Sequence, residues 1–139
     1  MIVYKVVEKN TRHCSNWAMM KHYQYDASIP KSFINFKKKH PDFFPRYLKG
    51  KTIKKVSESV GIFCFKDIDD AEVFINKGFG YNSKAIIIKV RGNGKIVHRP
   101  KIITGCGTSP SDLLLYKNKI YQEDGVQGSI AFPSVTVLE

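Results

Sequence analysis

The sequence predicts a single α+β domain, built on a mainly antiparallel sheet of five to seven strands with two or three short helices. Its 139 residues are enough for one hydrophobic core, and 42% of them are hydrophobic. Short runs with strand character outnumber helical runs, and most follow one another without a helix between them. This order favours hairpins over parallel crossovers, so we expect one antiparallel domain that spans residues 1–139.

The first third of the chain begins with a clear strand. In Ile2 to Glu8, β-branched or aromatic residues alternate with polar ones, which predicts a strand with one buried face. Residues 14–25 fit either a helix or a strand, and we favour a strand. Ser28 and Pro30 can open a short helix over 31–40, and Pro41 would stop it. A turn at 47–50 then leads into a short strand near 51–56.

The middle of the chain contains the clearest strand–helix unit. Residues 60–65 form an apolar run typical of a buried strand. Asp67 can cap a helix with Asp69 and Asp70 in its first turn, where carboxylates stabilise the helix dipole. Glycines at 78 and 80 end the amphipathic pattern, so the helix is expected to stop there.

The last third is expected to begin with a hairpin. The β-rich runs 85–91 and 95–103 are joined by Gly92-Asn93-Gly94, and Asn-Gly is the strongest short-range signal for a two-residue hairpin turn. A short helix is expected near 109–121, with Pro110 in its first turn. Residues 129–138 predict a final strand, in which Pro133 indicates an edge position or a bulge.

Positive charge is concentrated in one part of the chain. The formal net charge is +11, and residues 31–55 supply +8 of it through nine Lys or Arg residues against one acid, Asp42. The remaining 114 residues carry fourteen basic and eleven acidic residues. We call residues 28–55 the basic segment, and expect it to be insertion-like. Such local charge indicates a polyanionic partner.

Aromatic residues are interleaved with the cations of the basic segment. The cations suit the phosphate backbone of nucleic acid, and exposed aromatic rings can stack on unpaired bases. Alternatively, the aromatic residues pack into a small core while the lysines form a solvated face. The candidate nucleic-acid or anion-binding residues are Lys31, Lys37, Lys38, Lys39, Arg46, Lys49, Lys51, Lys54, Lys55, Phe43, Phe44 and Tyr47.

A second candidate anion site is the glycine-containing stretch 105–112. Glycines admit close backbone approach, and the helix expected after them would present free N–H groups. The stretch lacks the lysine and the spacing of a P-loop, and an ordinary turn before a capped helix explains it equally. The candidate phosphate-loop residues are Gly105, Gly107, Thr108 and Ser109.

Several classes of site are not predicted. The three cysteines form no C-x-x-C pair and the four histidines lack ligand spacing, so no metal site is expected. Cys64 fits a buried apolar position. No apolar run approaches the roughly 20 residues that span a bilayer, and no signal-peptide pattern opens the chain, so we expect no membrane partner and a cytoplasmic location. No catalytic constellation or cofactor motif is visible.

Several stretches carry a resemblance. Val3-Tyr4-Lys5-Val6-Val7, Tyr47-x-x-Gly50-Lys51 and Gly61-Ile-Phe-Cys-Phe with its following Asp70-Ala71-Glu72 resemble small phage and bacterial proteins. The order of elements is also distantly similar to ADP-ribosyltransferase-like domains, which hold NAD between strands. That resemblance implies that Lys5 replaces an Arg or His, that a serine supplies a hydroxyl, and that a late acid completes the site. The positions concerned are Lys5, Ser57, Ser59 and Glu123.

The sequence therefore favours a non-enzymatic binding protein of phage-like or bacterial type, acting in the host cytoplasm if a phage encodes it. We expect it to engage nucleic acid or an acidic protein surface through the basic segment. Two alternatives stay open: an ADP-ribosyltransferase-like or nucleotide-binding domain, and an inhibitor of a host defence enzyme. The exposure of the aromatic residues separates two binding modes, because buried rings leave only electrostatic contacts.

Overall fold

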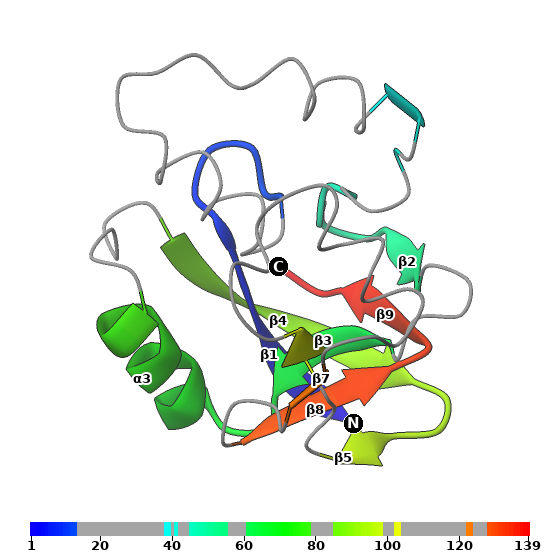
Figure 1. Ribbon diagram of the computed structural model, residues 1–139. Helices are drawn as coiled ribbons and strands as arrows, with labels where there is room; N and C mark the ends of the chain where they lie inside the picture. Colours follow the sequence, from blue (N-terminus) through cyan, green and yellow to red (C-terminus); the bar gives the residue numbers. More distant parts are fainter. Residues whose placement is uncertain are drawn as a thin grey trace.

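The computed structural model describes residues 1–13, 38–39, 41, 45–55, 61–78, 85–98, 102–103, 122–123 and 128–139 (Figure 1). They form a seven-stranded antiparallel sheet in the order β2-β9-β4-β1-β3-β8-β5, and β6 pairs separately with β7. The elements are β1 (Ile2–Glu8), β2 (Thr52–Lys54), β3 (Ile62–Phe65), α3 (Ile68–Gly78), β4 (Ala85–Asn93), β5 (Val97–His98), β6 (Ile102–Ile103), β7 (Gln122–Glu123), β8 (Ser129–Phe132) and β9 (Ser134–Val137).

The predicted antiparallel α+β architecture is confirmed for this part of the chain. β1, β2, β3 and α3 lie where the sequence pattern expects them, and α3 begins directly after its predicted cap, Asp67. α3 is the one helix that the described residues contain in full. Of the predicted helix over 31–40, only Lys38 and Lys39 are described as helical. The strand proposed within 14–25 and the helix near 109–121 lie outside the described residues.

The predicted final strand is divided in two. Only Pro133 separates β8 from β9, yet three strands (β4, β1 and β3) lie between them in the sheet. The sheet must therefore curl enough to bring the end of β8 next to the start of β9 at Pro133. Figure 1 shows the chain turning sharply between these two strands. The sequence predicts Pro133 at an edge position or a bulge of one strand; instead it ends β8 and precedes β9, which pairs with other strands, and a proline cannot donate a ladder hydrogen bond.

The predicted hairpin at Gly92-Asn93-Gly94 is wrong. β4 continues through Asn93 and pairs with β9, while β5 is an edge strand that pairs with β8. A Cβ at position 92 would lie 2.3 Å from the ring of Phe132, so this glycine leaves room for an aromatic side chain from β8. Gly94, with a φ of +89°, makes the turn instead. Long-range packing therefore overrides the local turn signal.

The sheet has an inner face and an outer face. The inner face carries the larger core, in which Val3, Val7, Val90 and Val137 are buried together with Phe132. On the outer face, α3 packs against β1, β3 and β4 (Figure 1). That second, smaller core is closed by Phe65 and Phe74, whose ring centroids are 5.2 Å apart.

Candidate anion-binding surface

The C-terminal part of the basic segment is built into the sheet. β2 is an edge strand that pairs with β9 alone, and residues 52 to 54 oppose 136 to 134. Ile53 points into the inner core, while Thr52 and Lys54 are exposed. Alternation along β2 therefore buries its apolar residue and leaves its cation at the surface.

The chain before β2 is anchored by backbone-directed hydrogen bonds. The N–H of Tyr47 donates to the Arg12 carbonyl at 2.9 Å, and Nε of Arg12 donates to the Tyr47 carbonyl at 2.7 Å. Nε of Arg46 donates to the Thr11 carbonyl at 2.8 Å. These bonds join residues 46 and 47 to residues 11 and 12, and so hold this part of the basic segment against the turn that follows β1.

That turn is organised by a buried carboxylate. Glu8 is 1% exposed, and its Oε2 accepts the Asn10 N–H at 3.1 Å and the Thr11 hydroxyl at 2.6 Å. Arg12 adopts a φ of 60°, which is uncommon outside glycine, and its guanidinium reaches the carbonyl of Glu139. Arg12 therefore links the basic segment at Tyr47 to the last described residue, Glu139.

Tyr47 is not available to stack on a base. Its side chain is 3% exposed and belongs to the inner core, where the Lys5 ammonium lies 5.1 Å from its ring centroid. The expectation that Tyr47 contributes a nucleic-acid stacking surface is therefore wrong. The other two candidate aromatic residues, Phe43 and Phe44, lie outside the described residues.

The described cations of the basic segment are all exposed. Five of them lie between positions 46 and 55, where the buried side chains of Tyr47 and Ile53 anchor the backbone. Two further candidates, Lys31 and Lys37, fall outside the described part of the chain. We call the exposed set the basic edge; it consists of Lys38, Lys39, Arg46, Lys49, Lys51, Lys54 and Lys55.

Polar side chains on the outer face of the sheet extend from the basic edge at β2 across β9 to β4. Paired residues of an antiparallel sheet point to the same face. Thr52 opposes Thr136, and Thr136 opposes Arg91, which gives one polar row across three strands. Lys54, Ser134 and Asn93 form a second row in the same way. We call these two rows the open half of the outer face, because α3 covers only the other half.

Hydrogen bonds confirm that these side chains share one face. The hydroxyls of Thr52 and Thr136 are 2.9 Å apart, and the Asn93 amide donates to the Thr136 hydroxyl at 3.2 Å. Arg91 is exposed, and within the described residues no carboxylate pairs with its guanidinium. The open half thus combines hydroxyl and amide groups with the cations of Lys54 and Arg91.

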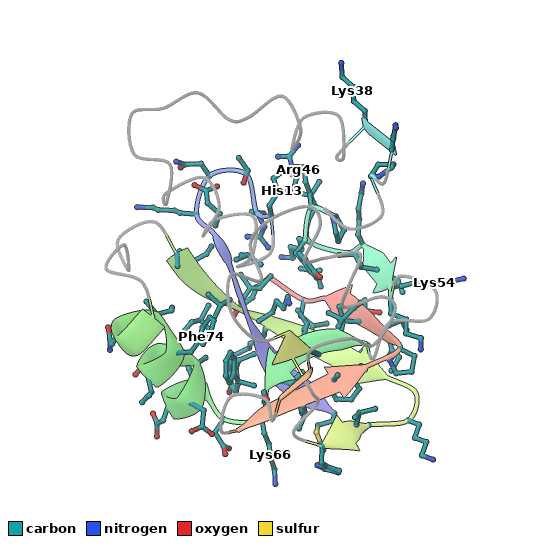
Figure 2. All side chains as sticks on the ribbon, in the orientation of Figure 1. His13, Lys38, Arg46, Lys54, Lys66 and Phe74 are labelled. Atoms are coloured by element: carbon teal, nitrogen blue, oxygen red, sulfur yellow. The ribbon has the colours of Figure 1, made fainter. Side chains whose placement is uncertain are left out.

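Among the described residues, the exposed acids of α3 lie apart from the basic edge. Asp67, Asp69 and Glu72 are exposed at the start of α3. Figure 2 shows Lys38 and Lys54 projecting on the side away from α3, while Lys66 projects elsewhere, at the bottom of the view. Glu139 lies at the border of the open half, where its Oε1 accepts the Lys89 N–H at 3.0 Å. An anion approaching the basic edge therefore meets cations before it meets the acids of α3.

The residues implied by the ADP-ribosyltransferase resemblance are only partly described. Lys5 is 6% exposed, and its Nζ donates to the Phe63 carbonyl at 2.7 Å. Glu123 belongs to β7, in the separate two-stranded sheet. Ser57 and Ser59 lie outside the described residues. The packing of Lys5 inside the core leaves its ammonium engaged with protein groups.

The four residues of the candidate phosphate loop, Gly105, Gly107, Thr108 and Ser109, all lie outside the described residues.

Burial controls the chemistry of Cys64. Burial raises the pKa of this thiol to about 11, and the nearby Lys5 ammonium offsets only part of that effect. A thiol with such a pKa is almost entirely protonated near neutrality and is a poor nucleophile. The interpretation of Cys64 as a small buried core residue is confirmed by its exposure of 1%.

The described ranges contain neither a metal-ligand cluster nor a membrane-spanning helix. No three His, Cys, Asp or Glu side chains gather there as metal ligands. No helix found in that part of the chain has the length and apolar character needed to cross a membrane.

The open half was missed by sequence reasoning. Its residues come from three stretches that are far apart in the chain, and only strand pairing brings them together. A signal was present in each stretch, since polar residues occupy alternate positions at 52 and 54, at 89, 91 and 93, and at 134 and 136. The sequence alone does not show that β2, β9 and β4 are neighbours in the sheet, so it does not show that these polar residues share one surface.

Comparison with known proteins adds no family to these observations. No protein-family model matches the chain, and no curated protein and no solved structure matches it either.

Proposed function

We propose that this protein binds nucleic acid electrostatically, through the phosphate backbone, by means of the basic edge. The observation that carries the proposal is the exposure of all seven described cations of the basic segment, while Tyr47 and Ile53 in the same segment are buried. Cations fixed on a folded edge can neutralise phosphates and release their counterions, which is the main source of sequence-independent affinity.

Binding through phosphate rather than through bases is favoured by the packing of Tyr47. Its burial removes one of the three expected stacking rings, and none of the described aromatic side chains is exposed. Lysine contacts to phosphate position a protein on nucleic acid without reading sequence. We therefore expect weak sequence dependence and strong salt dependence.

A charge-reversal series tests the proposal. Lys51→Glu should weaken binding to a short nucleic acid of mixed sequence about tenfold, and Lys49→Glu combined with Lys51→Glu should weaken it further. Lys66→Glu is the matched control, because it changes net charge equally at an exposed position away from the basic edge. The measurement is fluorescence anisotropy at fixed ionic strength, with circular dichroism to check folding.

Two outcomes would contradict the proposal. Equal weakening by Lys51→Glu and Lys66→Glu would show that only net charge matters. A wild-type protein that binds neither duplex nor single strands, but binds polyglutamate in a Lys51-dependent manner, would instead identify an acidic protein surface as the partner.

A further inference from the structure

The open half of the outer face has the chemistry of a phosphate-binding surface. Its two rows combine three exposed residues, Thr52, Lys54 and Arg91, with three half-buried polar residues, Thr136, Ser134 and Asn93. Arginine, lysine and short hydroxyl or amide side chains are the groups that most often contact phosphate and sugar in nucleic-acid complexes.

Arg91 is the distinctive member of this set. It lies on β4, a strand that pairs on both sides, with β1 and with β9, so its backbone is fixed inside the sheet. Its side chain is exposed, and no described carboxylate pairs with it. A guanidinium can hold a phosphate through two parallel hydrogen bonds, which an ammonium cannot do.

The spacing of the open half allows contacts to more than one phosphate. β2 and β4 are separated by β9 alone, so Thr52 and Arg91 lie about 10 Å apart across the sheet. This separation lets the two side chains contact different phosphates of one duplex.

The composition of the open half favours a duplex over an unpaired strand. Sequence-tolerant binding of single strands relies on aromatic rings that stack on successive bases. In the described part of the chain, every aromatic side chain is buried or half-buried, and none belongs to either polar row. A backbone with its bases already stacked inside a helix needs only the phosphate contacts that these rows offer.

We propose that the open half is a second contact surface, on which Arg91 binds the phosphate backbone of a nucleic-acid duplex between the hydroxyl groups of Thr136 and its neighbours. The proposal rests on the proposed function, and it extends that function by naming the ligand class and an arginine outside the basic segment. The duplex then contacts the basic edge and the outer face together, with Lys54 common to both.

The test measures duplex binding by anisotropy for the wild type and for Arg91→Glu, Arg91→Lys and the control Lys66→Glu. Arg91→Glu should weaken binding about tenfold and make the salt dependence less steep by about one phosphate contact. Arg91→Lys should recover part of the affinity, because it restores charge but not the bidentate geometry. Lys66→Glu should remain within about twofold of the wild type, since charges beyond a Debye length are largely screened.

The outcomes separate the two proposals. If Lys51→Glu weakens binding while Arg91→Glu behaves like Lys66→Glu, the basic edge binds nucleic acid and the open half does not. If a single strand binds more tightly than the duplex of the same sequence, the assignment of a duplex ligand is wrong although the proposed function survives. If the wild type binds neither form, both proposals fail.

Discussion

The two halves of the outer face differ sharply although the same strands build them. On β1, Val6 packs under α3 while Ile2, four residues away on the same face, is 55% exposed. On β4, Ile87 packs against the helix side and Arg91 faces solvent. Alternation along a strand decides which face a residue occupies, but the position of α3 decides whether that face is a core or a surface.

The largest expected effect comes from placing a charge on each half. Val6→Lys buries an unpaired ammonium beneath α3 and should lower the free energy of unfolding by about 4 kcal/mol. Ile2→Lys makes the same chemical change at an exposed position and should alter stability by less than about 0.5 kcal/mol. Urea unfolding followed by circular dichroism measures both. Equal losses in the two variants would show that the halves do not differ as described.

The next effect concerns the close contact between Gly92 on β4 and the ring of Phe132 on β8. Gly92→Ala places a methyl group 2.3 Å from the Phe132 ring, so we expect a loss of about 3 kcal/mol from overpacking. Phe132→Leu in the same chain should reduce the extra loss, because a smaller side chain relieves the contact. A double-mutant cycle from urea unfolding measures this coupling. Strictly additive losses would argue against close packing of β8 on β4.

A smaller effect is expected where α3 meets the sheet. Phe74→Ala removes the ring that packs on Phe65 and should cost about 2 kcal/mol, less than a fully buried phenylalanine because Phe74 is half-buried. Val73→Ala is the matched control, since Val73 is 48% exposed on the same helix. Thermal unfolding compares the two variants, and a larger loss for Val73→Ala would contradict the orientation of α3.

The smallest effect tests the polar rows themselves. Thr136→Val removes the hydroxyl that contacts Thr52 and Asn93 and should cost about 0.5 kcal/mol, because water replaces these bonds at a surface. Thr136→Ser keeps the hydroxyl and should retain most of that energy. Both values come from urea unfolding. If valine proves no less stable than serine at this position, the hydroxyl contacts contribute nothing to the folded state.

Local patterns were enough to predict the class of fold and several of its elements. β1 and α3 follow directly from alternation and from the acidic cap at Asp67, since both signals lie within single short stretches. The pairing of β4 with β9 could not be predicted from local sequence. Gly92 suggests a turn, but in the fold it leaves room for the ring of Phe132, which comes from a strand distant in sequence.

The candidate surface was predictable only in part. The cations of the basic edge are visible as a local excess of charge, and the described ones are exposed. The burial of Tyr47 was not predictable, because its environment is supplied by β1 and by the turn after it. Arg91 was missed because its partners in the polar rows come from residues about 40 positions away in the chain.

The salt dependence of duplex binding tests the central claim most directly. If about half of the nine cations in residues 31–55 contact phosphate, the logarithm of the association constant should fall with the logarithm of salt concentration at a slope near −4. Arg91→Glu should make that slope shallower by about one, and Lys66→Glu should leave it unchanged. A wild-type slope near zero would contradict binding through the phosphate backbone.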